Sequence, residues 1–196
     1  MAFYHRAMTT IDRLPFTGDD EADRLLVAEP LALLIGFALD QQVTVQKAFS
    51  GPLELSRRIG HLDAARIAAM DPVALDAVFR ERPALHRFPG SMAGKVQALC
   101  AAIAADYTND AALVWTGASD GTDLQRRLLG LPGIGEMKAG AIIAILGKRF
   151  GLSVPGLDAV MPTHPTLGDV DSAEALADYQ AGKRARKAEI RAARGD

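Results

Sequence analysis

The chain has 196 residues, of which 49% are hydrophobic and 23% are charged. These proportions exclude an intrinsically disordered chain and provide enough apolar material for a core. The formal net charge of -2 argues at first against a nucleic-acid partner, and the single cysteine, Cys100, excludes an internal disulfide and any cluster held by several thiolates. We expect Cys100 to be a buried thiol.

Hydrophobic periodicity predicts helices throughout the N-terminal half of the chain. The segment "LALLIGFALDQQVTVQKAF" at 31–49 is apolar on almost every side, so it is predicted to be one central helix that ends at "SGP". Asp71 and Pro72 match an N-cap and the first residue of a helix. The helices expected in this half run over 19–30, 31–49, 52–60, 62–70 and 71–83.

The C-terminal half shows the same periodicity. Thr122 and Gln125 match a capping box at the start of a helix, and residues 151–172 are rich in Gly and Pro and are predicted to form a long loop. The helices expected in this half run over 91–107, 109–118, 122–130, 136–150 and 173–196.

The charge is concentrated at the C-terminal end of the chain. Residues 183–196 have six basic and two acidic residues, a net charge of +4, which leaves 16 basic and 22 acidic residues, a net charge of -6, on the remainder. A basic tail on an acidic body adds phosphate affinity without sequence preference. The alternative is a solvated final helix with a basic face, and both interpretations stay open.

No strand pattern and no repeat of fixed period occurs, so the predicted fold class is all-α, a two-lobed bundle of roughly ten helices without an iron–sulfur cluster. We expect one domain over 1–196. Its two lobes would comprise about 25–120 and about 1–24 together with 121–196.

The stretch "LPGIG" at 131–135 lies between the two helices of a predicted hairpin at 122–150. Its proline and two glycines predict a tight turn that brings backbone N–H groups to the start of the second helix. These N–H groups lack intrahelical partners, and the helix dipole favours an anion beside them. The stretch therefore predicts a phosphate clamp formed by Gly133, Ile134 and Gly135. The alternative is a plain helical hairpin with a Gly/Pro turn.

The segment "LPGIGEMKAGAIIAILGKRFG" resembles the helix-hairpin-helix of the HhH-GPD superfamily of DNA glycosylases, which includes the endonuclease III, adenine glycosylase and alkyladenine glycosylase relatives. The resemblance extends upstream to "LLIGFALDQQVTVQKA" and "FPGSMAGKVQAL". It covers about residues 25–150 and is closest to a short bacterial branch. The four-cysteine loop of the endonuclease III relatives is absent.

The resemblance implies roles for side chains at two places. A Gln fills the space left by a flipped base in such enzymes. Gln42 matches that position, with Gln41 beside it; the alternative is that both satisfy buried backbone groups. Bifunctional relatives have a strand-cleaving lysine where this chain has Met137. Lys138 lies one residue later, about 100° around the helix. The resemblance therefore implies no lyase activity and a Lys138 that faces a phosphate or solvent.

The resemblance also implies a carboxylate that stabilises the cation-like sugar and orients the attacking water. In the superfamily it lies roughly twenty residues after the second hairpin glycine, often in "VDTH". Here Pro162 precedes the "TH" pair, and the nearest candidate is Asp158. The alternative for Asp158 is a helix N-cap or an exposed loop residue. Asp169 and Asp171 are weaker candidates.

The leading hypothesis is a monofunctional DNA N-glycosylase, a hydrolase for base excision repair that removes a damaged base, with an alkylated purine as the best substrate candidate. The alternatives are a DNA-binding or lesion-recognition module without catalysis and, more remotely, a scaffold whose hairpin contacts a protein.

No cofactor or metal is expected, apart from an optional monovalent cation at the hairpin. We expect a monomer that binds damaged double-stranded DNA. Because the sequence shows no signal peptide and no bilayer-length apolar run, we expect a cytoplasmic, nucleoid-associated bacterial protein without a membrane partner.

Overall fold

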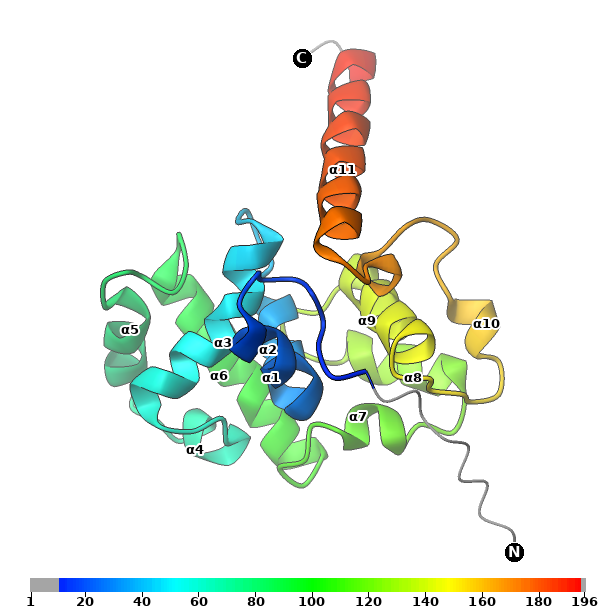
Figure 1. Cartoon of the computed structure of the whole chain (residues 1–196). Coiled ribbons are helices and arrows are strands. Elements are labelled where there is room, and N and C mark those ends of the chain that lie inside the picture. Colours follow the sequence, from blue (N-terminus) through cyan, green and yellow to red (C-terminus); the bar gives the residue numbers. More distant parts are fainter. Residues whose placement is uncertain (1–10, 195–196) are drawn as a thin grey trace, which may run out of the picture.

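The computed structural model describes residues 11–194. Within this range the chain forms α-helices and one 3-10 helix, η1, and no strand (Figure 1), which confirms the predicted all-α class. No helix in this range is both long enough and apolar enough to cross a membrane. The helices are α1 (Asp20–Ala28), α2 (Pro30–Leu39), α3 (Val45–Ile59), α4 (Ala64–Ala68), α5 (Pro72–Arg80), α6 (Pro89–Asp106), α7 (Leu113–Thr116), α8 (Gly121–Leu129), α9 (Glu136–Lys148), α10 (Leu157–Val160), η1 (Leu167–Asp169) and α11 (Ala173–Arg194).

Helix α2 is the centre of the larger of two helical bodies. Its residues 31–39 are all buried, because α1, α3 and α6 pack around it, and α4 and α5 pack on the outer side of α6. α2 and α3 approach most closely at Gly36, where an added Cβ would lie 2.5 Å from the Phe49 ring. Cys100 is buried in this body as predicted, and burial raises the pKa of its thiol to about 12.

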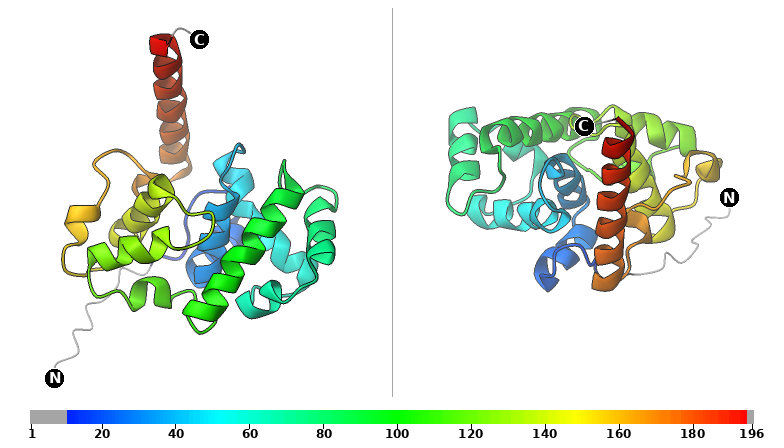
Figure 2. Two further views of the ribbon diagram at one scale, coloured as in Figure 1. Left: turned by 180° about the vertical axis from the view of Figure 1, so that it is seen from behind. Right: turned by 90° about the horizontal axis from the view of Figure 1, so that it is seen from above.

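Helix α9 is the centre of the smaller body. It is buried along most of 139–146, where α8, α10 and η1 pack against it. Gly168 of η1 permits a very close approach, since a Cβ there would lie 2.5 Å from the backbone carbon of Ala144. The two bodies lie side by side (Figure 2), and their buried residues form one continuous core.

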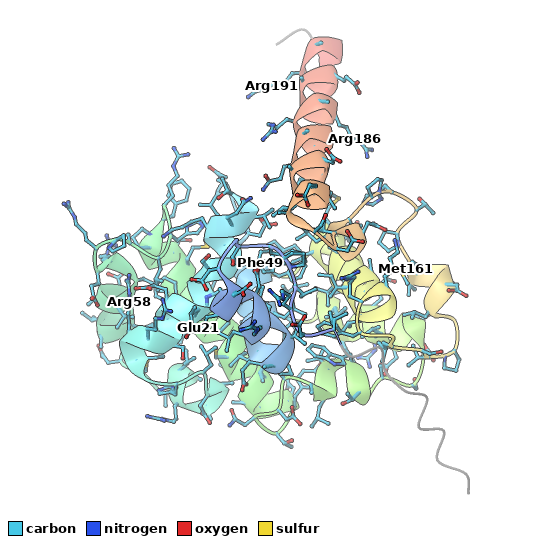
Figure 3. The ribbon with its side chains drawn as sticks, in the orientation of Figure 1. Glu21, Phe49, Arg58, Met161, Arg186 and Arg191 are labelled. Carbon is cyan, nitrogen blue, oxygen red and sulfur yellow. The ribbon has the colours of Figure 1, made fainter. Side chains whose placement is uncertain are left out.

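Helix α11 projects away from both bodies (Figures 1 and 2). Only its first turns are attached: the Leu176 side chain is buried, and the Gln180 Nε2 donates a hydrogen bond to the Gln46 Oε1 at 2.9 Å. Arg186 and Arg191 lie on the projecting part (Figure 3). The predicted final helix therefore starts at the expected residue, and its last two predicted residues lie outside the described range.

The predicted single helix over 31–49 is wrong. α2 ends at Leu39, Gln42 has a positive φ of 54°, and α3 begins after Thr44, whose hydroxyl accepts a hydrogen bond from the Lys47 N–H at 3.2 Å. Nor does "SGP" end a helix, since Pro52 lies inside α3. The packing of α3 on α1 and α2 compensates for the hydrogen bond that Pro52 cannot donate. The chain thus turns a corner at 40–44, beside the second body.

Other predicted boundaries also shift. The N-cap of α8 is Asp120, whose carboxylate accepts from the Asp123 N–H at 2.9 Å, so the predicted cap at Thr122 is wrong. Residues 151–172 contain α10 and η1 and are not a continuous loop. The segment 11–24, predicted with the second lobe, lies against α2 and α3 through α1, and residues 1–10 of that prediction are outside the described range.

Candidate functional site

Helices α8 and α9 are joined by a short turn at 130–135. Gly133 has a φ of 85°, in the left-handed region that favours glycine. The Ile134 N–H donates to the Leu131 carbonyl at 3.1 Å, and the Ile134 side chain is buried. Ile134 therefore closes the turn and packs into the core, so its N–H is not free for a ligand.

Gly135 leaves the start of α9 open. It is the N-cap, with an extended backbone that any residue adopts, and an added Cβ would meet nothing within 4 Å. Neither strain nor internal packing therefore requires glycine at this position. The first N–H groups of α9 (136–138) have no intrahelical partner, as at any helix start, and Gly135 provides no side-chain cap for them. The Glu136 carboxylate at the same helix start opposes an anion, so firm anion binding here needs additional positive charge nearby.

Lys138 links the turn to the larger body. Its Nζ donates to the Gly133 carbonyl at 3.1 Å and to the Ala38 carbonyl, at the end of α2, at 3.5 Å. This orientation differs from the predicted one, because the side chain is half-buried between the bodies while its neighbour Met137 is 74% exposed. Burial lowers the pKa of the Lys138 ammonium, and nearby Asp40 offsets part of this effect.

The corner at 40–44 separates the two predicted glutamines. The Gln41 Oε1 accepts a hydrogen bond from the Lys95 Nζ at 2.6 Å, which fixes this side chain to α6. Gln42 is exposed at the point of the corner. Only Gln42 is therefore free to reach a ligand, as a wedge residue requires.

Asp40, at the start of the same corner, is a half-buried carboxylate that sequence reasoning missed. Burial raises the pKa of the Asp40 carboxyl, and the positive charges of Lys183 and Lys138 offset part of the rise. A carboxylate with a perturbed pKa beside two amines is typical of a reactive site. The only sequence signal was an acidic residue directly after nine apolar residues, and the prediction of a continuous helix obscured it.

Asp158, the carboxylate proposed from the resemblance, is not brought to the turn. It is exposed on α10, and α10 packs at the opposite end of α9, where the Leu157 Cδ2 lies 3.3 Å from a Cβ built on Gly147. Gly147 is twelve residues beyond Gly135, about 18 Å along the helix at 1.5 Å per residue. Asp169 accepts from the Lys148 Nζ at 2.5 Å and caps η1, so it has a structural role.

His86 supports the end of α2 from the neighbouring loop. Its Nε2 lies 3.1 Å from the Leu39 carbonyl, and its Nδ1 accepts from the Phe88 N–H at 3.0 Å. This pairing requires the neutral ring with the proton on Nε2. Burial lowers the pKa of the His86 imidazole.

We expect the protein to lose stability as the pH falls below about 6.5, the usual pKa of an unfolded histidine. With the folded pKa lowered, the unfolded state binds more protons in this window, so stability is complete above it and decreases below it by up to ~1.4 kcal/mol per pH unit. Urea unfolding at neutral and acidic pH measures the loss, and His86→Gln should reduce it. The same loss in His86→Gln would contradict this assignment; the lowered pKa of His61 acts in the same direction in both proteins.

Comparison of the chain with models of known families, with curated proteins and with solved structures gives no match. Within residues 11–194, no group of three or more His, Cys, Asp or Glu side chains could hold a metal ion. At the turn, the Gly133 carbonyl is already engaged by the Lys138 ammonium. The monovalent cation at the hairpin stays a prediction.

Proposed function

We propose that the protein is a DNA-binding repair protein of the HhH-GPD type that grips duplex DNA at the α8–α9 turn. We further propose that it removes a damaged base by hydrolysis, without cleaving the strand. One observation carries the proposal: an uncapped helix start and a half-buried carboxylate, Asp40, meet at the same junction between the two bodies. Lys138 spans that junction, since it contacts both the turn and the end of α2.

Binding of a DNA phosphate is supported by the open space at Gly135 and the unpartnered N–H groups of α9. Lys138 and Lys183, whose charges act on Asp40 in the junction, provide positive charge that offsets the repulsion between Glu136 and an anion. The basic residues of α11 extend this charge to one side of the junction, where Arg186 and Arg191 are exposed (Figure 3). Such contacts predict affinity that falls steeply with salt concentration.

Base removal is supported by Asp40. In the proposed reaction the glycosidic bond breaks with its electron pair moving to the base, and water adds to C1′ of the sugar. The Asp40 carboxylate stabilises the cation-like sugar and accepts the proton of the water. An alkylated purine suits this site best, because its positive charge already weakens the bond and is neutralised as the base leaves.

Strand cleavage is not part of the proposal. A lyase requires a free amine that attacks the sugar, and the Lys138 Nζ is engaged by two backbone carbonyls inside the junction. The position that carries the amine in bifunctional relatives is the exposed Met137.

A second candidate function is a DNA-binding or lesion-recognition module without catalysis. The position of Asp158 favours it, because the carboxylate implied by the resemblance lies at the far end of α9 from the turn. The module needs only the turn, the exposed Gln42 and the basic helix.

Duplexes that each contain one alkylated, oxidised or deaminated base test the proposal. We expect at least one alkylated substrate to yield abasic sites without strand breaks and without a borohydride-trapped protein–DNA adduct. Tight binding with no base released from any duplex would favour the module. A trapped adduct that Lys138→Gln abolishes would establish lyase chemistry and refute the monofunctional assignment. If no duplex binds at low salt, the scaffold hypothesis is favoured.

A further inference from the structure

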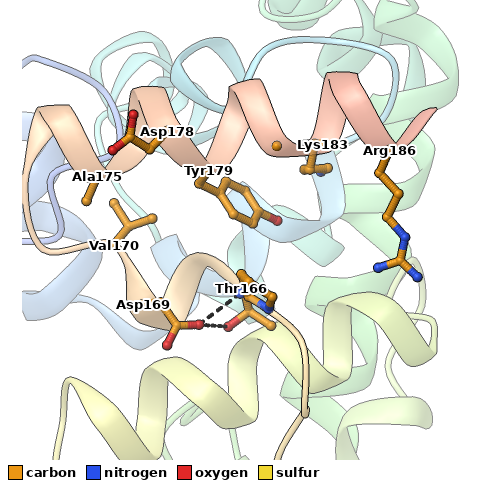
Figure 4. Close-up of a pocket in the computed structure, with 10 residues that line it drawn as sticks. Thr166, Asp169, Val170, Ala175, Asp178, Tyr179, Lys183 and Arg186 are labelled. Carbon is orange, nitrogen blue, oxygen red and sulfur yellow. Dashed lines mark hydrogen bonds between the residues drawn. The ribbon is translucent and has the colours of Figure 1, made fainter. Parts of the chain in front are cut away.

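Helix α11 has one face turned toward the protein and one face turned away from it. The first face carries the buried Leu176 and the half-buried Tyr179, which points toward Thr166 across the hollow beneath the helix (Figure 4). Beyond Gln180, every residue of 181–192 whose burial is described is exposed. An isolated helix shorter than about 12–15 residues is only marginally stable in water, so a second helix packed beside this projecting length would stabilise it.

The face turned away has a regular pattern. Its exposed residues follow one another at alternating intervals of three and four positions: Glu174, Ala177, Ala181, Arg184, Ala188 and Arg191. We call these six residues the outer face of α11. Their spacing places them on one side of the helix, separate from the stripe of Leu176, Tyr179 and Lys183. It is also the 3.5-residue repeat along which two helices pack, and alanine at such positions allows a close approach.

The charges of α11 are divided along its length. Residues 171–178 include three acidic and no basic residues, whereas residues 183–191 include five basic residues and one acidic residue. This division suits the dipole of a single helix, and it also makes the helix complementary to a second copy that runs in the opposite direction. A parallel copy would place like charges beside each other. A nucleic acid would match the basic half alone, because its phosphates repel the acidic half.

One antiparallel register satisfies both the spacing and the charges. When Glu174 of one copy lies opposite Arg191 of the other, Ala177 lies opposite Ala188, and the remaining two residues of the outer face meet at the centre. Because an antiparallel pair of identical helices has two-fold symmetry, each of these contacts occurs twice. The pair therefore has an ion pair at each end and alanine contacts between them.

We infer that the outer face of α11 binds a second copy of the same chain, as an antiparallel pair of helices. The inference goes beyond the proposed function and does not depend on it, and it differs from the monomer that the sequence predicts. Lys183 and Arg186 stay outside the paired face, so they remain available to DNA. A contact limited to one helix from each copy is smaller than the ~1,200 Å² of stable complexes, so the dimer should form at roughly micromolar protein concentrations.

Sedimentation velocity of the full chain at increasing concentration measures the monomer–dimer equilibrium. Glu174→Arg and Arg191→Glu should each weaken dimerisation by at least about tenfold, because each reversal creates two pairs of like charges. The double variant should dimerise again, since the ion pair returns with its signs exchanged. The matched control is Glu189→Arg, which adds the same charge to α11 about 100° around the helix from Ala188 and should dimerise like the wild type. Circular dichroism of each preparation checks that α11 stays helical.

Cysteine variants test the direction of the pairing. Ala177→Cys and Ala188→Cys, prepared separately and mixed under mild oxidation, should give a cross-linked heterodimer that neither variant gives alone. Cys100 is buried and does not compete. Cross-linking of either variant with itself would show a parallel pair and overturn the inference. A chain that stays monomeric at every concentration, or a double charge variant that does not dimerise, would overturn it equally.

Discussion

Asp40→Asn is expected to reduce base excision by roughly 10²- to 10⁴-fold while leaving DNA binding nearly unchanged. The amide keeps the size of the side chain but cannot neutralise a cation-like sugar or take up a proton from water. Single-turnover release of the base from an alkylated duplex measures the effect, and anisotropy with the same duplex measures binding. In the wild type, the raised pKa of Asp40 places the acidic limb of activity above the ordinary value of 3.8.

The control is Asp158→Asn, at the exposed carboxylate on α10. We expect wild-type activity, because α10 packs on α9 at Gly147, about 18 Å along α9 from the turn at 1.5 Å per residue. The reverse pattern, with Asp158→Asn inactive and Asp40→Asn active, would refute the role of Asp40 and restore the carboxylate that the resemblance implies.

Gly135→Ala is expected to weaken duplex binding by about tenfold, equivalent to ~1.4 kcal/mol, without changing the free energy of unfolding by more than about 0.5 kcal/mol. The new Cβ meets no protein atom and the backbone is extended, so the methyl group obstructs only a ligand. Anisotropy at several salt concentrations and urea unfolding of the same preparations measure the two quantities.

Two variants make this result interpretable. Gly133→Ala forces alanine to a φ of 85°, so it should lose about 1–2 kcal/mol of stability in addition to affinity. Val73→Ala, at a residue 76% exposed on α5 in the larger body, should change neither quantity. Unchanged DNA affinity in Gly135→Ala would mean that the glycine makes no room for a phosphate and that the hairpin is a structural turn.

Local signals in the sequence were sufficient for much of the fold. Asp71 and Pro72 begin α5 as predicted, because an N-cap carboxylate followed by proline is stable with few other contacts. The break between α2 and α3 was not predictable in this way. Both helices are apolar enough to merge into one periodic run, and the corner depends on the positive φ of Gln42 and the cap at Thr44.

The candidate site shows the same difference between features set by local sequence and features set by distant contacts. The glycines and the turn between two helices were predictable, because a tight turn restricts which residues it accepts. The direction of Lys138 was not, since it depends on the carbonyl of Ala38, one hundred residues earlier in the chain. Asp40 was not predictable for the same reason: the cations that act on it come from α9 and α11, which no local pattern connects to it.

The attachment of α11 includes two uncharged contacts, the buried Leu176 and the amide pair of Gln180 and Gln46. Dissolved ions weaken contacts between charges far more than apolar burial or neutral amide contacts. A salt wash that releases the proposed nucleic-acid ligand would consequently leave these two contacts of the helix in place. We therefore expect repeated cycles of high and low salt to release and rebind the proposed ligand while α11 keeps its orientation.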